Sequence, residues 1–240
     1  MAKKSIDYAA ARRAAEEQAR KQKRNMKIFL ISAIAVLVVV VAAIIIVNVT
    51  KEKYVPLAQV QDEIDGYKAT DFVETDKESK YVIIKVKDYG DIVCELREDI
   101  APITVKNFKK LVSEKFYDGL IFHRVIEDFM IQGGGYDLDF KEKDAASIKG
   151  EFTSNGVTND LKHYRGVLSM ARTSVKNSAS SQFFIMHKTS SHLDGEYASF
   201  GYVLAGMDVV DRIAAVETNA SDAPLDPVII ESIRFATYNK

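Results

Sequence analysis

The stretch "FHRVIEDFMIQGGG", residues 122–135, decides the fold and poses a chemical problem. It is largely apolar, yet Arg124 lies inside it. In an extended strand side chains alternate between faces, so Phe122, Arg124 and Ile126 share one face. A buried guanidinium without a partner is very costly. Arg124 therefore either forms an ion pair with a carboxylate or reaches into a cleft where it acts on another molecule.

Short strand-like runs surround this stretch on both sides. Two lie within "KYVIIKVKDYGDIVCELRE", around a tight turn at residues 88–90, and two more lie within "GLIFHRVIEDFMIQGG". Further runs of this kind are "GEFTSNG", "GVLSMAR", "SQFFIMHK", "YASFGYVLAG" and "PVIIESIRF". Helices are predicted over "APITVKNFKKLVSEKF" and "MDVVDRIAAV", which lie far apart in the chain. The pattern predicts a mainly β fold, a closed and largely antiparallel barrel capped by two helices.

Charge is distributed unevenly over the 240 residues, although the formal net charge is only −1. Residues 1–27 carry nine Lys and Arg against three Asp and Glu, and the remainder carries 24 basic and 31 acidic side chains. An acidic main domain argues against nucleic acid as a partner, because phosphate binding needs a basic surface. Cys94 is the only cysteine, which excludes an intramolecular disulfide.

The segment "IFLISAIAVLVVVVAAIIIV", residues 28–47, contains twenty residues without a charge. As a helix it would just span a bilayer core of about 30 Å. A cleaved signal peptide is the main alternative, but its apolar core is usually about 7–15 residues long and precedes a small-residue cleavage site. The sequence favours an uncleaved transmembrane signal-anchor that holds the protein in the lipid bilayer.

The flanks of this segment predict its orientation. Basic residues precede it within residues 1–27, whereas few follow it. By the positive-inside rule the N-terminus lies in the cytoplasm, and everything after residue 50 lies on the extracytoplasmic side. The basic segment is interpreted as a solvated, positively charged end of the span that stays at the membrane surface. The alternative is a segment that docks on another molecule or on lipid headgroups. Residues 48–78 are polar and are predicted to be a linker, so the folded domain is expected at residues 79–240.

Motifs for metal or nucleophilic chemistry are lacking in the sequence. The four histidines, at positions 123, 163, 187 and 192, follow no zinc-ligand spacing. "QGGG" is not followed by the Lys-Ser/Thr pair of a phosphate-binding loop, and Ser169 lacks the second glycine of a nucleophile elbow. The sequence therefore predicts a site that uses no metal and no cofactor.

Three motifs, "FHRVIEDFMIQGG", "GVLSMAR…SASSQFFI" and "LDGEYASFG", together resemble the cyclophilin-type peptidyl-prolyl cis-trans isomerases. "APITVKNF" near the start and "VIIESI" near the end agree with this resemblance, which extends over residues 80–237. The resemblance implies an eight-stranded closed barrel capped by two helices. It also implies an enzyme that accelerates rotation about X–Pro peptide bonds, a reaction that makes and breaks no covalent bond.

Matching the motifs position by position implies the site residues. Arg124 corresponds to the catalytic arginine, and Gln132 to the residue that hydrogen-bonds the substrate backbone. His123 lies beside the arginine in the same motif. The proline pocket corresponds to Phe129, Met130, Phe184 and Leu193, and the groove corresponds to Ala171, Arg172 and Gln182.

Two site positions depart from the family pattern. His192 stands where the best-known members have Trp, which removes an indole donor and argues against tight cyclosporin binding. Tyr197 stands where many members have His, so one wall of the pocket differs in shape and polarity.

The sequence therefore predicts a single-pass, membrane-anchored isomerase that accelerates the folding of exported or surface proteins. In this interpretation Arg124 donates a hydrogen bond to the proline nitrogen of the twisted amide. Two alternatives stay open. The domain could be a non-catalytic module or chaperone that binds proline-containing segments in the same groove. Arg124 could form a structural ion pair with Glu127, Asp128 or a more distant acid.

Overall fold

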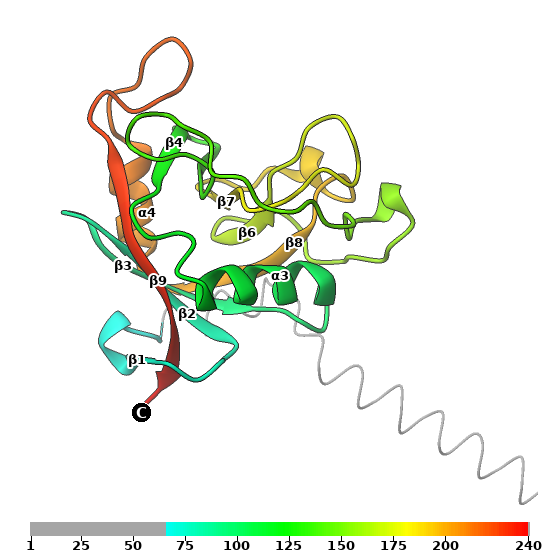
Figure 1. Ribbon diagram of the computed structural model, residues 1–240, viewed down its shortest axis with the longest axis horizontal. Helices are drawn as coiled ribbons and strands as arrows, with labels where there is room; N and C mark the ends of the chain where they lie inside the picture. The colour runs from blue at the N-terminus through cyan, green and yellow to red at the C-terminus, as the bar shows by residue number, and fades with distance from the viewer. Residues whose placement is uncertain (1–65, 240) are drawn as a thin grey trace, which may run out of the picture. The chain divides into compact units, whose positions relative to one another are not determined.

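Eight antiparallel strands close into a barrel within residues 66–239, the part of the chain that the computed structural model describes (Figure 1). Around the barrel the strands follow the order β9-β2-β3-β8-β6-β7-β5-β4, and β4 pairs again with β9. The strands are β2 (Tyr81–Val86), β3 (Gly90–Leu96), β4 (Ile121–Ile126), β5 (Met130–Gly133), β6 (Val167–Met170), β7 (Phe183–Met186), β8 (Ser199–Ala205) and β9 (Val228–Tyr238). The prediction of a closed antiparallel barrel is confirmed.

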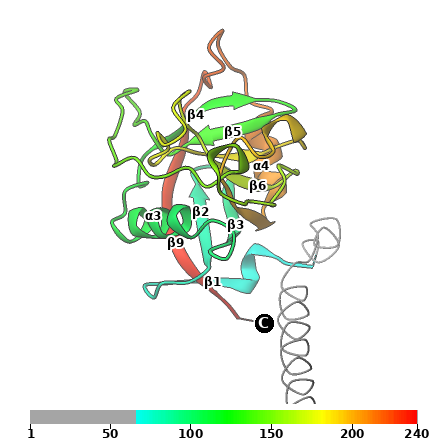
Figure 2. The ribbon, with the colours of Figure 1, turned by 90° about the vertical axis from the view of Figure 1, so that its right-hand side faces the viewer.

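Two α-helices, α3 (Pro102–Ser113) and α4 (Met207–Ala214), lie on opposite sides of the strands in Figure 2. Each buries one face, with Val105 and Phe108 inward on α3 and Val210 inward on α4. These side chains join one interior cluster with the inward residues of the strands. On each helix this buried face is formed by apolar residues that are three or four positions apart in the sequence. Both predicted helices are confirmed.

A ninth strand, β1 (Phe72–Thr75), pairs with the C-terminal end of β9 and follows the 3-10 helix η1 (Ala69–Asp71). Phe72 is buried, and its ring centroid lies 5.3 Å from that of Tyr81 and 5.2 Å from that of Tyr238. The prediction of a linker through residue 78 is therefore wrong for residues 69–75. An aromatic side chain among polar residues buries enough apolar surface to hold this segment to the sheet.

The predicted basic segment 1–27 and the predicted membrane span 28–47 lie outside the described residues, as does the predicted linker up to residue 65. Within residues 66–239, no helix has the length and apolar character needed to cross a bilayer. Anchoring and orientation therefore stay predictions from the sequence.

The run "GEFTSNG" does not form the predicted strand and contains instead the 3-10 helix η2 (Thr153–Asn155). Its Glu151 is 2% exposed, and the carboxylate accepts hydrogen bonds from the backbone N–H groups of Ile103 and Thr104 at 3.0 and 2.8 Å. The start of α3 has no side-chain cap of its own, because Ala101 occupies the N-cap position. Glu151 therefore supplies, from a distant loop, the acceptor that the helix start needs.

Replacing Glu151 by alanine is expected to lower the free energy of unfolding by about 2–3 kcal/mol, because the buried N–H of Thr104 and the partly buried N–H of Ile103 lose their acceptor. Denaturant unfolding followed by circular dichroism measures this change. Glu231→Ala, which removes an exposed carboxylate on β9, is the control and is expected to change stability by less than about 0.5 kcal/mol. Equal effects of the two substitutions would contradict the capping role.

Candidate active site

Nine side chains surround a small open pocket of about 130 Å³ on the barrel. A pocket of this size admits a small ring rather than a drug-sized ligand, for which about 300–1,000 Å³ is usual. All nine are among the twelve predicted site residues. They are Arg124, Phe129, Met130, Gln132, Ala171, Arg172, Phe184, Leu193 and Tyr197. The other three predicted residues, His123, Gln182 and His192, neighbour lining residues without lining the pocket themselves.

Three neighbouring strands place the central side chains of the pocket in one row. On the β4–β5 hairpin Arg124 lies opposite Gln132, and Gln132 in turn lies opposite Phe184 of β7. Directly opposite residues of antiparallel strands project to the same face of the sheet. The guanidinium, the amide and the aromatic ring are therefore brought together by strand register, although Phe184 is distant in the sequence.

Arg124 is partly exposed and has a carboxylate beside it. Its Nε donates to Oδ2 of Asp222 at 3.2 Å, and Asp222 belongs to the loop between α4 and β9. The side chain is 42% exposed, so the guanidinium is neither buried nor unpaired. The sequence posed an ion pair and a cleft as alternatives, and the structure contains both. The partner is the distant Asp222 rather than Glu127 or Asp128.

Gln132 is held by a neighbouring amide. Its Nε2 donates to Oε1 of Gln182 at 3.0 Å, and Nε2 of Gln182 donates to Oε1 of Glu142 at 3.4 Å. Gly135 makes room for this arrangement, because a Cβ at that position would lie 2.4 Å from Cγ of Gln182. Gln182 therefore orients Gln132. The side chain of Gln182 can lie this close to the backbone because the last residue of "QGGG" is a glycine.

Arg172 lies between two aromatic rings. Its guanidinium carbon is 4.6 Å from the ring centroid of Tyr197 and 5.0 Å from that of Phe152, distances at which a cation is attracted to a ring face. Nε and Nη2 donate to the carbonyl oxygen of Glu196, at 3.0 and 2.9 Å, and Nη1 donates to that of Thr173 at 2.9 Å. All three nitrogens thus contact the backbone of the protein itself. Arg172 therefore stiffens the wall formed by Tyr197.

His192 supports another wall of the pocket from outside. It lies in the 3-10 helix η3 (Ser191–Leu193), is exposed, and stacks on Phe129 with 5.7 Å between ring centroids. The next residue, Leu193, is buried and lines the pocket. His192 therefore fixes the position of Phe129 without contributing to the pocket surface.

His123 precedes Arg124 on β4, and its ring lies against Tyr136 with 4.6 Å between centroids. Its Nδ1 is buried and has no hydrogen-bond partner among residues 66–239. Burial, together with the charge of Arg124, lowers the pKa of His123 from 6.5 to about 4. His123 is therefore neutral at pH 7 and adds no second positive charge beside the arginine.

The free energy of unfolding is expected to decrease as the pH falls from 6.5 towards about 4, because His123 binds a proton more readily in the unfolded chain than in the folded one. The pKa of His163 is also lowered by burial, so it contributes in the same direction. His123→Gln is expected to reduce the pH dependence in this range without abolishing it. Thermal unfolding across the range measures the effect, and an unchanged slope in the variant would contradict it.

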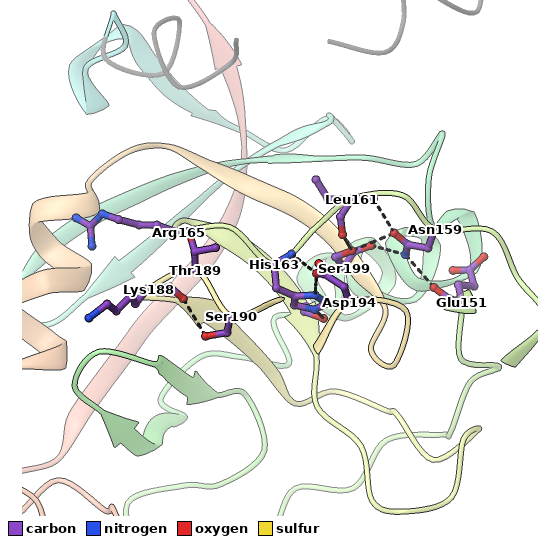
Figure 3. Close-up of polar contacts among 11 residues, drawn as sticks. Glu151, Asn159, Leu161, His163, Arg165, Lys188, Thr189, Ser190, Asp194 and Ser199 are labelled. Carbon is purple, nitrogen blue, oxygen red and sulfur yellow. Dashed lines mark hydrogen bonds and ion pairs between the residues drawn. The ribbon is translucent and has the colours of Figure 1, made fainter. Parts of the chain in front are cut away.

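A buried chain of polar side chains lies behind the pocket, where Figure 3 shows His163 beside Asp194. His163 is 1% exposed, with Nδ1 3.1 Å from Oδ1 of Asp194 and Nε2 3.0 Å from Oγ of Ser169. A carboxylate only accepts, so Nδ1 carries the hydrogen and Nε2 accepts from the hydroxyl. Ser169 is fully buried, so this Ser–His–Asp arrangement cannot reach a substrate. It backs the pocket, because His163 stacks on Phe184 with 6.1 Å between centroids.

Known proteins are similar to this chain in sequence and in fold. The family model described as cyclophilin type peptidyl-prolyl cis-trans isomerase/CLD matches residues 81–235. A peptidyl-prolyl cis-trans isomerase of Acinetobacter baylyi is 48% identical over 160 residues, which are 62% of this chain and 82% of the relative. Peptidyl-prolyl cis-trans isomerase B of Escherichia coli is 45% identical over 158 residues, 61% of this chain and 94% of the relative.

A solved structure agrees with these sequence matches. It is a cyclophilin type peptidyl-prolyl cis-trans isomerase of Cryptosporidium parvum in the presence of the dipeptide Ala-Pro. It is 32% identical to this chain, with a TM-score of 0.56, and the match covers 65% of this chain and 98% of that one.

The closed eight-stranded barrel with two helices and a small pocket defines a class of enzyme that rotates prolyl peptide bonds. The chain belongs to the cyclophilin-type peptidyl-prolyl cis-trans isomerases, and its activity is the cis-trans isomerisation of peptidyl-prolyl bonds. The fold class and the reaction implied by the three sequence motifs are thereby confirmed.

Proposed function

We propose that Arg124 is the catalytic residue of this isomerase and donates a hydrogen bond to the proline nitrogen of the twisted X–Pro amide. Resonance in a planar peptide bond sets a rotational barrier of about 18–20 kcal/mol. As the amide twists, resonance is lost and the nitrogen regains a lone pair. A donor aimed at that lone pair stabilises the twisted state more than the planar one, which is the condition for catalysis.

The observation that carries this proposal is the position of Arg124 in the wall of a small pocket, next to Gln132 and opposite apolar side chains. Arginine keeps its charge at any ordinary pH, so the donor is always available. Phe129 and Phe184 offer an apolar surface for the proline ring, and Gln132 offers an amide for a substrate carbonyl.

Polypeptides that contain proline are the proposed substrates. The size of the pocket supports this choice, since it accommodates one small ring. The relative from Cryptosporidium parvum, whose structure was determined in the presence of Ala-Pro, gives further support. Tight binding of cyclosporin is not expected, because His192 provides no indole donor. The acidic balance of the domain argues against nucleic acid as a partner.

A second part of the proposal concerns the place of action. We propose that residues 28–47 anchor the chain in a membrane and that the domain lies on the extracytoplasmic side, where it accelerates the folding of exported or surface proteins. The uncharged twenty-residue segment and its basic N-terminal flank support this proposal. Isomerisation of X–Pro bonds takes tens to hundreds of seconds without a catalyst, so it delays folding after export.

Cell fractionation tests the anchor. The full-length protein is expected in the membrane fraction, and a variant without residues 1–50 in the soluble fraction. Protease added to cells with a permeabilised outer layer is expected to digest the domain while cytoplasmic proteins stay intact. Full-length protein in the soluble fraction, or a domain that resists such protease, would contradict the proposed location.

Refolding of a protein limited by proline isomerisation tests the activity against the alternative of a non-catalytic binding module. Full-length protein in mild detergent, at a concentration far below that of the refolding protein, is expected to shorten the slow phase. A binding module would act only at stoichiometric concentration, by retaining the unfolded chain. Slower refolding at stoichiometric concentration, without acceleration below it, would favour the binding module.

A further inference from the structure

The loop between α4 and β9 forms a small hairpin that presents Asp222. Asn219 organises the loop, because its Oδ1 accepts hydrogen bonds from the N–H groups of Ser221 and Ala223 at 2.8 and 3.2 Å. The N–H of Asn219 also donates to the carbonyl oxygen of Ala223 at 2.8 Å. Asp222 has φ +61°, in the left-handed region that Asp and Asn tolerate better than most residues. The loop therefore fixes Asp222 through its own hydrogen bonds.

Asp222 contacts two successive residues of β4. The N–H of Val125 donates to the backbone carbonyl of Asp222 at 2.8 Å, and Nε of Arg124 donates to its carboxylate at 3.2 Å. In Figures 1 and 2 the loop before β9 extends beside β4. The backbone and the side chain of Asp222 thus join the loop to the strand at the position of Arg124.

The ion pair of Arg124 and Asp222 forms through Nε of the arginine, which distinguishes it from two other ion pairs of the domain. Asp211 binds both terminal nitrogens of Arg165, at 2.7 and 2.8 Å. Asp118 likewise binds both terminal nitrogens of Arg234, at 2.7 and 2.6 Å. Such two-point contacts occupy the end of the guanidinium. Asp222 contacts the inner nitrogen and so leaves both terminal amino groups of Arg124 available to a substrate.

We propose that Asp222 is a positioning residue, which holds Arg124 in its orientation in the pocket wall before substrate binds. This inference rests on the proposed role of Arg124 as the donor. A free arginine side chain loses much rotational freedom when it is ordered, and a partner that orders it in the free enzyme removes this loss from the catalytic step. The two side chains are 42% and 43% exposed, so their pairing contributes little to the stability of the fold.

Asp222→Asn in the full-length protein tests the positioning role, because asparagine keeps the size and the tolerance for positive φ while it removes the charge. We expect kcat for an X–Pro peptide to fall by about 3–10-fold, with KM and Tm nearly unchanged. Asp226→Asn removes an exposed carboxylate from the same loop and is expected to leave all three quantities unchanged. In an Arg124→Ala background, Asp222→Asn is expected to have no further effect on kcat.

The outcomes separate this inference from the proposal on which it rests. If Arg124→Ala loses activity but Asp222→Asn leaves kcat unchanged or raises it, the positioning role is overturned and the donor role stands. A fall in kcat of the same size in the Arg124→Ala background also overturns it, because the effect would then bypass the arginine. If Arg124→Ala keeps the wild-type kcat, the donor proposal fails, and the positioning role fails with it.

Discussion

Replacing Arg124 by alanine is expected to lower kcat for X–Pro isomerisation by about 10²–10³-fold, the usual effect of deleting one preorganised donor. KM is expected to change little, because the walls of the pocket, including Phe129, Met130 and Phe184, remain. Stability is also expected to change little, since the side chain is partly exposed and its carboxylate partner, Asp222, is partly exposed as well. A spectroscopic assay of a short X–Pro peptide measures both kinetic constants.

Two further substitutions sharpen this result. Arg124→Lys keeps the positive charge but offers a compact ammonium in place of the planar guanidinium, so a partial loss is expected. Arg234→Ala removes an arginine that is paired with Asp118 and lies outside the pocket lining, and it is expected to leave kcat unchanged. A wild-type kcat in Arg124→Ala, or an equal loss in Arg234→Ala, would contradict the donor role.

Replacing Phe184 by leucine is expected to raise KM by about tenfold or more, because the substitution removes a ring from the wall of the proline pocket. The ring is 5% exposed and is held at fixed orientation, stacked on His163 and edge-on to Tyr197 with 6.0 Å between centroids. Leucine fills part of the volume, so the variant is expected to fold with a loss of about 1–3 kcal/mol in the free energy of unfolding.

The adjacent Phe183 provides a matched control. Side chains alternate along β7, so Phe183 joins the interior cluster of the barrel, whereas Phe184 joins the cluster that contains the pocket residues Met130 and Leu193. Phe183→Leu is expected to destabilise the fold by a similar amount while leaving KM unchanged. Denaturant unfolding and peptide kinetics on both variants measure these effects. A rise in KM for Phe183→Leu, or none for Phe184→Leu, would contradict the assignment of Phe184 to the pocket.

Most strands could be predicted because each is a short apolar run bounded by turn residues, and both helices because their apolar residues recur every three or four positions. The two errors arise from long-range contacts. Residues 69–75 resemble a linker in the sequence. In the structure, however, Phe72 is buried against Tyr238, which comes from the opposite end of the domain's sequence. "GEFTSNG" resembles a strand, but its Glu151 accepts a hydrogen bond from the backbone at the start of α3. Neither contact can be predicted from the local sequence pattern.

The candidate site was predictable to the extent that its residues belong to recognisable motifs. Arg124 and Gln132 share one motif, and strand pairing then places Phe184 beside them. Asp222 lies 98 positions from Arg124 and belongs to no motif, so the sequence gives no signal for it beyond the general expectation of a distant acid. Asp194, in "LDGEYASFG", does belong to a motif, but its contact with His163 depends on packing that the motif does not reveal.

Two-dimensional exchange spectroscopy by NMR, applied to an X–Pro peptide, tests the central claim most directly, because it observes rotation of the prolyl bond itself. With a small amount of full-length wild type in mild detergent, we predict exchange peaks between the cis and trans forms of the peptide. With Arg124→Ala at the same concentration we predict that these peaks are lost, while line broadening still reports binding of the peptide. Exchange of equal rate in Arg124→Ala, or binding without exchange in the wild type, would contradict catalysis by the arginine of this pocket.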